Sequence, residues 1–269
     1  MPRAHRHYIP GCVWHITHRC HKQEFLLKFE KDRTRWCHWL FEAKKRYGLC
    51  VLNYIATSNH VHLLVVDSKE GVIPKSLQLI AGRTAQEFNI RKKRKGAFWE
   101  DRYHATAVQT DEHLAKCMVY IDLNMVRAGV VQHPSEYTAS GYNEIQNPPK
   151  RYSIINRKTL LELFTIHDEN RFQSEHHGWV ETELKNNVNK RNILWSESVA
   201  VGCESFIKDI HQQLAWRAKG RSIISNADDE SIALKEPQTS YNTLFADKKT
   251  ILRQDNTYIL QIKYDSSGC

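Results

Sequence analysis

The sequence has few features that would anchor it in a membrane or cross-link it. Its longest apolar stretches, such as residues 63–66, are far shorter than the roughly 20 residues of a membrane-spanning helix, and its first residues lack the apolar segment of a signal peptide. Its seven cysteines form an odd set without a Cys-x-x-Cys pair, which argues against a disulfide framework and against a thiolate zinc knuckle. We therefore expect a folded cytoplasmic protein without a membrane partner.

Positive charge is concentrated in the first 150 residues. They carry 23 Lys and Arg against 14 Asp and Glu, whereas residues 151–269 carry 16 of each, so the first part holds the whole net charge of +9. It also holds 11 of the 15 histidines. A basic half indicates a polyanionic partner, and nucleic acid is favoured over a membrane because no basic amphipathic helix stands out.

Periodic patterns of apolar residues predict an α+β fold in the first part of the chain. Two-residue alternation predicts four strands, at residues 12–19, 49–56, 60–66 and 104–109. Helical spacing predicts three helices, at residues 29–47, 73–90 and 110–129. The order β-α-β-β-α-β-α indicates an antiparallel sheet packed against helices.

The tandem prolines Pro148 and Pro149 are the best candidate for a domain boundary, because prolines interrupt both helices and strands and the charge balance changes there. We expect one domain at residues 1–147 and a mainly helical extension at residues 148–269. Helical character in the extension occurs at residues 153–164, 179–189 and 196–215. Its last forty or so residues are polar, and we expect them to be partly disordered.

Two histidines separated by one residue, His60 and His62, lie in the third predicted strand. The two-residue period of a strand places both imidazoles on the same face, about 7 Å apart at the backbone, and both rings can then reach one metal ion. Taken alone, a His-x-His pair is more often a surface feature of a half-exposed strand than a metal site.

Tyr120 and Asn124 are four residues apart on the last predicted helix, so their side chains project from the same face. Taken alone, such a tyrosine is usually a packing residue. Combined with His60 and His62, however, the amide oxygen completes a ligand set that leaves positions on a metal open for phosphate oxygens. Tyr120 would lie beside the ion as a nucleophile, and because a free phenol reacts poorly at neutral pH, proximity and metal charge would have to activate it.

Four stretches of the chain carry a resemblance to a known family, at residues 14–19 (WHITHR), 58–64 (SNHVHLL), 98–104 (FWEDRYH) and 120–129 (YIDLNMVRAG). In order and spacing they resemble the HUH transposases with a single catalytic tyrosine, especially the REP-associated tyrosine transposases of bacteria. Ser58 and Met125 stand where that family usually has proline, and its Trp-Ser-Ser-Tyr run is matched only loosely by residues 136–140. No catalytic group is lost, but Met125 leaves the placing of Asn124 open.

The resemblance implies a ferredoxin-like HUH nuclease fold with a divalent ion, Mg²⁺ or Mn²⁺, on His60, His62 and Asn124. It implies that Tyr120 cleaves single-stranded DNA, forms a 5′-phosphotyrosine link and transfers the strand. The substrate would be hairpin-forming DNA such as palindromic repeats. The chain would then be a DNA transposase that associates with the nucleoid when it is bound to DNA, and a homodimer is left open.

Basic and aromatic residues near these motifs are candidates for holding the DNA strand. They are the run Arg91, Lys92, Lys93, Arg94 and Lys95, the cluster Arg102, Tyr103 and His104, and the arm residues Arg3 and Arg6. A solvated charged loop is the ordinary alternative for the run and for the arm. His15 and His18 fall on opposite faces of the first strand, so at most one could approach the metal, and we treat both as structural.

Two other functions stay open: a DNA- or RNA-binding protein that keeps the fold without the chemistry, and a metal phosphohydrolase that uses His60 and His62 with water as nucleophile. The complete set of predicted ligands and nucleophile argues against the first, and a covalent adduct with DNA would exclude the second. Because the whole predicted site and the whole net charge precede Pro148, we expect residues 148–269 to do no chemistry. A chain that ends near Pro148 would then still cleave DNA.

Overall fold

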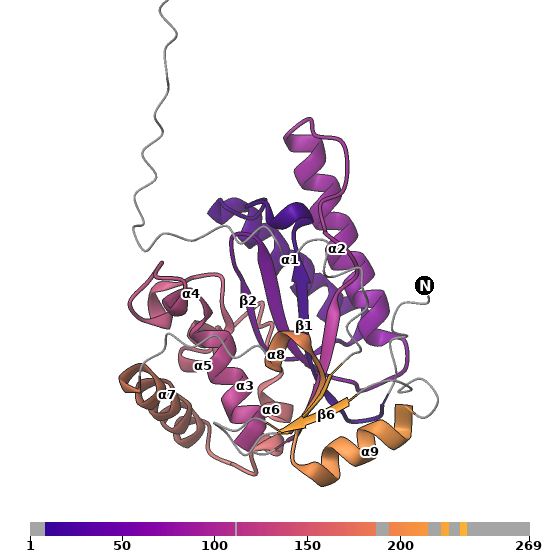
Figure 1. Ribbon diagram of the computed structural model, residues 1–269. Coiled ribbons are helices and arrows are strands. Elements are labelled where there is room, and N and C mark those ends of the chain that lie inside the picture. Colours follow the sequence, from indigo (N-terminus) through magenta and orange to yellow (C-terminus); the bar gives the residue numbers. More distant parts are fainter. Residues whose placement is uncertain (1–8, 111, 187–193, 215–221, 226–231, 236–269) are drawn as a thin grey trace, which may run out of the picture. The chain divides into compact units, whose positions relative to one another are not determined.

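Figure 1 shows the computed structural model of the chain, which describes residues 9–110, 112–186, 194–214, 222–225 and 232–235. The predicted arm residues Arg3 and Arg6 lie outside this part, and so does most of the polar C-terminal stretch for which disorder was expected. No helix in the described part is long and apolar enough to span a membrane. The described residues belong to one compact unit, Met1–Glu236.

One sheet runs through the described part of the chain. Its strands are β1 (Val13–Arg19), β2 (Cys50–Ala56), β3 (His60–Val66), β4 (His104–Val108), β5 (Ser198–Gly202), β6 (Ser222–Ser225) and β7 (Ile232–Lys235). Their spatial order is β2-β3-β1-β4-β5-β7-β6. β1 pairs antiparallel with both β3 and β4, and β2 pairs antiparallel with β3. The predicted α+β fold with a ferredoxin-like antiparallel sheet is therefore confirmed.

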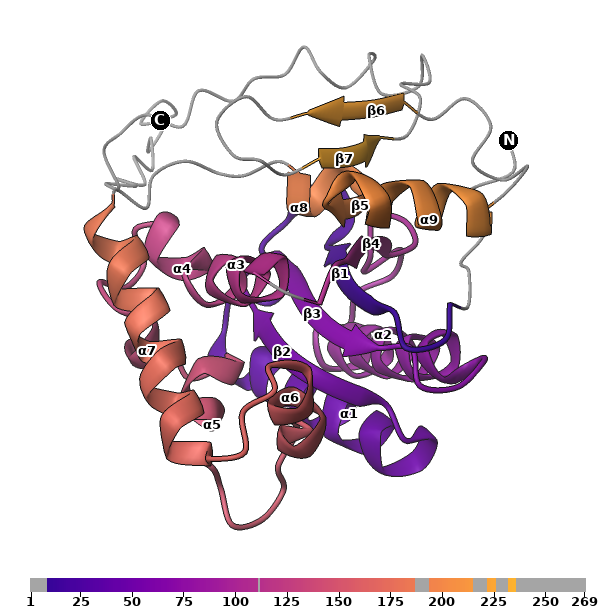
Figure 2. The same cartoon turned by 90° about the horizontal axis from the view of Figure 1, so that it is seen from below.

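Helices pack on both faces of this sheet, with α1 (Glu30–Tyr47) and α2 (Val72–Arg91) on one side and α3 (Glu112–Asp122) on the other (Figure 2). α1 ends where Gly48 takes the left-handed conformation, with φ at 73°. Its apolar stripe is buried and consists of Trp36, Trp39, Leu40 and Ala43. The predicted bounds of β1 to β4, α1 and α2 agree with the structure to within one residue at each end.

The third predicted helix, residues 110–129, is interrupted. α3 ends at Asp122 and the short α4 (Asn124–Arg127) begins after Leu123, whose φ and ψ are −81° and 4°. Gly129 then takes a φ of 66°, a left-handed conformation that suits a glycine at the end of a helix.

The extension adds strands as well as helices. Its helices are α6 (Arg157–Leu163), α7 (Glu169–Lys185), α8 (Leu194–Glu197) and α9 (Glu204–Leu214). The stretch predicted as one helix at residues 196–215 begins instead with β5, which pairs parallel with β4 and continues the sheet. β5, β6 and β7 of the extension therefore share a sheet with the first domain, and the division near residue 147 stays a prediction about where the chemistry resides.

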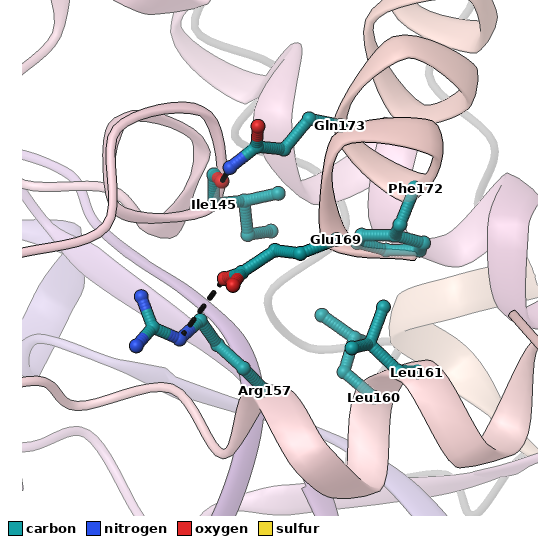
Figure 3. A pocket seen from close by; sticks show the side chains of 7 residues that line it. All are labelled: Ile145, Arg157, Leu160, Leu161, Glu169, Phe172 and Gln173. Atoms are coloured by element: carbon teal, nitrogen blue, oxygen red, sulfur yellow. Dashed lines mark hydrogen bonds and ion pairs between the residues drawn. The ribbon is translucent and has the colours of Figure 1, made fainter. Parts of the chain in front are cut away.

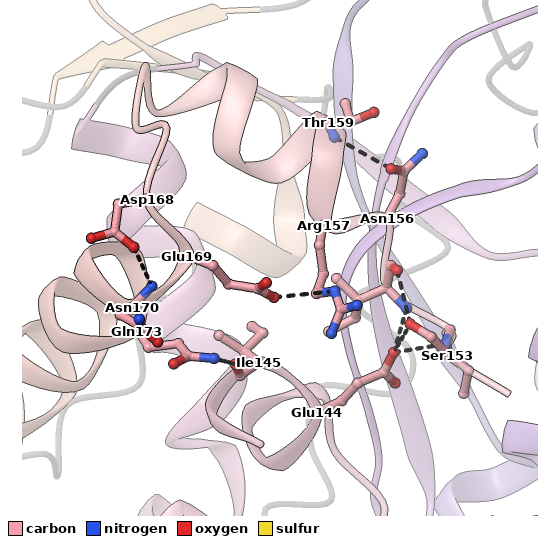
Figure 4. A network of polar contacts seen from close by, with 12 residues as sticks. Glu144, Ile145, Ser153, Asn156, Arg157, Thr159, Asp168, Glu169, Asn170 and Gln173 are labelled. Atoms are coloured by element: carbon pink, nitrogen blue, oxygen red, sulfur yellow. Dashed lines mark hydrogen bonds and ion pairs between the residues drawn. The ribbon is translucent and has the colours of Figure 1, made fainter. Parts of the chain in front are cut away.

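A buried carboxylate holds the start of the extension to the first domain (Figure 4). Glu144, in α5 (Gly141–Gln146), accepts hydrogen bonds at Oε1 from the Ser153 hydroxyl at 2.7 Å and from the backbone N–H groups of Ile154 at 2.7 Å and Ile155 at 2.8 Å. Its Oε2 accepts one from the Tyr54 hydroxyl on β2 at 3.2 Å. The segment after the tandem prolines is thus tied to both α5 and β2.

We predict that Glu144→Ala lowers the free energy of unfolding by about 3 kcal/mol, because buried donors lose a charged acceptor. The matched control is Glu162→Ala, whose exposed carboxylate pairs with Lys158 at 3.9 Å and should matter by less than about 0.5 kcal/mol. Urea denaturation of both variants measures the difference. Equal losses in the two variants would show that the Glu144 contacts do not hold the extension.

Candidate active site

The register of β1, β3 and β4 gathers four imidazoles on one face of the sheet. Thr17 in β1 lies opposite His62 in β3 and opposite His104 in β4. Residues paired across strands share a face, and so do residues two apart along a strand. His15, His60, His62 and His104 therefore all lie on the face that α3 covers. This arrangement supports the prediction that His60 and His62 can act together.

His18 points to the opposite face, as predicted. Its ring stacks on Trp99 with centroids 4.1 Å apart, and its Nε2 lies 2.8 Å from the carbonyl oxygen of Asp101. Trp99 in turn donates from its indole to the carbonyl oxygen of Ala81 in α2. His18 is therefore part of the packing on the α1 and α2 side.

The rings of His60 and His62 are close and nearly perpendicular, with centroids 4.9 Å apart and an interplanar angle of 81°. His60 Nδ1 lies 2.7 Å from the side-chain oxygen of Asn59. An amide oxygen only accepts, so Nδ1 carries the proton and the lone pair of the neutral ring is on Nε2. Thr57 adds a hydroxyl 3.0 Å from the same nitrogen and holds the ring further.

A chain of hydrogen bonds determines the tautomer of His62. His15 Nδ1 lies 2.8 Å from the carbonyl oxygen of Trp195, and His15 Nε2 lies 2.9 Å from His62 Nδ1. Burial lowers the pKa of His15 to about 3, so its ring is neutral and carries one proton. The carbonyl needs that proton on Nδ1, which leaves Nε2 to accept from His62. His62 therefore keeps its lone pair on Nε2, which lies 3.0 Å from the side-chain nitrogen of Asn124.

This chain of hydrogen bonds departs from the prediction that His15 is only structural. His15 is fully buried and touches a predicted metal ligand directly. A histidine that binds a metal commonly donates its other N–H to a partner that orients the ring, and the Nδ1 contacts of His60 and His62 have this form. Sequence patterns gave no signal for the contact, because Trp195 is 180 residues away from His15.

Tyr120 lies beside this imidazole cluster. Its ring stands edge-on to that of His62, with centroids 5.8 Å apart, and edge-on to that of His15 at 6.0 Å. The structure thus brings together Tyr120, Asn124 and His62, as the helical and strand periods predicted. The interruption of the helix at Leu123 does not separate the phenol from the amide.

A buried polar network holds the helix that carries Tyr120. Asp122 accepts hydrogen bonds from Asn53 on β2 at 2.9 Å and from His176 on α7 at 2.8 Å. Gln146 lies 2.9 Å from the other ring nitrogen of His176. The side chains of Asp122 and His176 are fully buried, and a buried carboxylate without its partners would be strongly destabilising. This network therefore restricts the rotation and register of α3.

Two neighbours of Tyr120 were missed by the sequence reasoning. The Arg127 guanidinium carbon lies 4.3 Å from the centre of the phenol ring, and the Trp195 ring lies 6.4 Å from it. Arg127 follows Tyr120 by two helical turns, and that spacing could have revealed it. Trp195 has no such relation to the motifs.

The extension therefore contributes to the site. The carbonyl oxygen of Ser198 accepts from His104 Nε2 at 2.8 Å, and the Trp195 ring lies against the tyrosine. A chain that ends at the predicted boundary would lack both of these contacts and the carbonyl that holds His15. Whether such a chain still cleaves DNA, as the sequence predicts, stays a prediction.

The predicted DNA-binding residues differ in their contacts and in the exposure of their side chains. Arg91 pairs with the buried Asp32, and Arg94 donates to the carbonyl oxygen of Ala97 at 2.8 Å. These two arginines hold the end of α2 in place. The remaining side chains of the run are exposed and belong to Lys92, Lys93 and Lys95. In the second cluster, Arg102 is exposed as well.

Within the second cluster, Tyr103 and His104 are partly buried, unlike Arg102. The ring of His104 is turned toward the extension, where it contacts Ser198. Arg102 is therefore the member of the cluster best exposed to a bound strand.

A hollow among α5, α6 and α7 lies apart from this cluster and is lined by none of the predicted site residues (Figure 3). Its lining is Ile145, Arg157, Leu160, Leu161, Glu169, Phe172 and Gln173. Arg157 and Glu169 form an ion pair at 3.2 Å, and the Gln173 amide donates to the carbonyl oxygen of Ile145 at 3.1 Å. These polar groups are occupied by one another, so the hollow offers no chemistry.

Comparison with known proteins agrees with the fold and the gathered motifs. Residues 8–124 match the family model described as "Transposase IS200 like". The matched stretch includes the four imidazoles, Tyr120 and Asn124.

Two solved structures are similar to the chain at low sequence identity. One is a REP-associated tyrosine transposase bound to a REP hairpin, with 18% identity over 54% of this chain and 84% of that chain, at a TM-score of 0.43. The other is a candidate transposase from Deinococcus radiodurans R1, with 19% identity over 44% of this chain and 93% of that chain, at a TM-score of 0.33. No curated protein matches the sequence.

We predict that His15→Leu weakens binding of Mn²⁺ to the candidate site by about 10- to 100-fold, because His62 loses the acceptor that orients it. His15→Gln should retain more affinity, since an amide offers both an acceptor and a donor in that position. Calorimetric titration of the folded variants measures the effect. Unchanged Mn²⁺ affinity in a folded His15→Leu variant would contradict the orienting role.

Proposed function

We propose that this chain cleaves and rejoins single-stranded DNA with Tyr120 as the nucleophile and a divalent ion held by His60, His62 and Asn124. The observation that carries the proposal is the contact between the rings of Tyr120 and His62, whose centroids are 5.8 Å apart, at the edge of the imidazole cluster. It lies in the part of the chain that matches the IS200-like transposases.

The donor set fits a divalent ion. Both predicted imidazole ligands have Nδ1 tied to neighbours, so that each presents its Nε2 lone pair, and the Asn124 amide is already within 3.0 Å of His62 Nε2. Rotation of the Asn124 amide by a half turn would present its oxygen to the ion instead of its nitrogen. A bound divalent ion would polarise the phosphate and offset the charge that develops on it. Imidazole nitrogen suits Mn²⁺ better than Mg²⁺, so Mn²⁺ is the appropriate probe.

Tyr120 would attack the phosphorus of the bound strand. Its phenolic oxygen forms a bond to phosphorus while the bond from phosphorus to the 3′ oxygen breaks. The phenol proton leaves to solvent, and the departing 3′ oxygen takes up a proton. Attack of a 3′-hydroxyl on the resulting 5′-phosphotyrosine reverses these changes, so the strand is rejoined without ATP.

Arg127 supports this assignment by its position. Its guanidinium lies 4.3 Å from the Tyr120 ring, where a fixed positive charge attracts the negative charge that develops on the phenolic oxygen. The buried network around Asp122 holds the same helix, so the nucleophile and Asn124 keep their places relative to β3.

The substrate we propose is a hairpin-forming single strand, as the four matching motifs imply for a transposase of the REP-associated type. The exposed side chains of Lys92, Lys93, Lys95 and Arg102 are the described residues best suited to contact its phosphates. Arg91 and Arg94 would act mainly by holding the end of α2.

We predict that Tyr120→Phe forms no covalent adduct with hairpin DNA, because only the attacking hydroxyl is removed. DNA affinity should change by less than about twofold, since basic contacts to the backbone supply most of it. Denaturing gel electrophoresis after incubation with labelled DNA detects the adduct. Tyr47→Phe, at an exposed tyrosine on α1, is the control and should react normally. An undiminished adduct in the Tyr120 variant would exclude this nucleophile, and cleavage by the unaltered protein without any adduct would favour hydrolysis by water.

We also predict that His60→Ala combined with His62→Ala stops cleavage while hairpin affinity falls by less than about threefold, because the altered side chains are not the main phosphate contacts. Chelation of divalent ions should have the same effect on the unaltered protein. His38→Ala, at an exposed histidine on α1, serves as the control. Cleavage that persists in the double variant or in the presence of the chelator would show that the reaction does not need this site.

A further inference from the structure

Two histidines and a glutamate gather away from the candidate active site. One ligand atom from each of His133, His177 and Glu181 lies within 4.8 Å of the others. His177 and Glu181 are four residues apart on α7 and so lie on the same side of that helix. His133 precedes the short turn Pro134–Glu136, which follows α4. In the described part of the chain no other three residues of the types His, Cys, Asp or Glu form such a group.

Both imidazoles of this group are held by hydroxyl groups. His133 Nδ1 accepts a hydrogen bond from the backbone N–H of Ser135 at 3.2 Å and lies 2.7 Å from the Ser135 hydroxyl, and His177 Nδ1 lies 3.0 Å from the hydroxyl of the buried Tyr142. Each ring thus has one nitrogen engaged with a fixed neighbour and another that can bind a ligand. Partners of this kind orient the histidines of metal sites.

The carboxylate of the group lacks a permanent cation. Within the described part of the chain, the ion-pair partner of Glu181 is His133, whose Nε2 lies 3.1 Å from Oε1. This partner is an imidazole and not a Lys or Arg side chain. A divalent ion placed between the carboxylate and the two rings would supply both the charge and a common centre for the three ligand atoms.

We propose that His133, His177 and Glu181 form a second metal site, for which Zn²⁺ is the best chemical fit. Zn²⁺ binds histidine nitrogen and carboxylate oxygen, and three protein ligands leave one position for water. Ligand atoms around a tetrahedral Zn²⁺ are about 3.4 Å apart, so the group has to contract by somewhat more than 1 Å. His177 is exposed, and the side chains of His133 and Glu181 are partly exposed. The proposal does not depend on the proposed catalytic function.

The site would act as a tether between two parts of the chain that position the catalytic helix. One ligand follows α4, which begins at Asn124, and the other two are on α7. His176, next to His177, is the residue that binds Asp122 at the end of α3. α7 lies beside α3 in both views of the fold (Figures 1 and 2). Bound Zn²⁺ would therefore hold α7 in the place where it supports α3, and would stabilise the folded chain by mass action.

The test uses the full chain with His60→Ala and His62→Ala, which removes the first predicted metal site. Calorimetric titration with Zn²⁺ should show one bound ion, and thermal unfolding should show a rise in Tm with Zn²⁺. Adding His133→Ala and His177→Ala should weaken Zn²⁺ binding by about tenfold or more and abolish the rise in Tm. The control adds His167→Ala to the same starting variant, at an exposed histidine just before α7. It should leave the Zn²⁺ affinity and the rise in Tm unchanged.

A second variant guards against effects on folding. Glu181→Gln keeps the shape and the hydrogen bond of the side chain but removes its charge, and it should also weaken Zn²⁺ binding while leaving the Tm without metal unchanged. Two results would overturn the proposal. One is that the His60 and His62 double variant binds no Zn²⁺ at about 100 µM. The other is that removal of His133 and His177 leaves the affinity as it was.

Discussion

The antiparallel pairing of β1 with β3 and β4 is the constraint on which the rest of the structure depends. It sets Thr17 between His62 and His104 and brings His15 against His62. A slip of β1 by one residue would turn His15 toward α1 and α2 and would turn the apolar residues that alternate with it toward the imidazole face. Those residues include Trp14 and Ile16, and burying a large apolar side chain stabilises by about 1.5–3 kcal/mol. The packing of the apolar side chains on one face of the sheet therefore fixes the register that holds the imidazoles on the other face.

The parts of the fold and site that could be predicted from sequence are those set by short-range periodicity. The shared face of His60 and His62 follows from the strand period, and the shared face of Tyr120 and Asn124 follows from the helical period. Both relations survive in the structure, although the helix is interrupted at Leu123. The first four strands and two helices were located to within one residue because each has a strong apolar pattern bounded by polar or glycine residues.

The remaining features depend on contacts between residues far apart in sequence, which no local pattern encodes. β5 was read as part of a helix because its five residues are too few to establish a period, and its partner β4 lies about 90 residues earlier. His15 was treated as structural because its two contacts lie 47 and 180 residues away. The role of Asp122 is equally long-range, since Asn53 and His176 come from β2 and α7.

Trp195 reaches His15 with a main-chain oxygen rather than with its side chain. Every amino acid carries that oxygen, so no substitution at position 195 deletes the acceptor. Natural variation can alter the residue while the hydrogen bond to His15 persists, whereas an insertion or deletion beside it would carry the oxygen out of reach. For the hydrogen bond to His15, the length of the segment therefore matters more than the identity of residue 195.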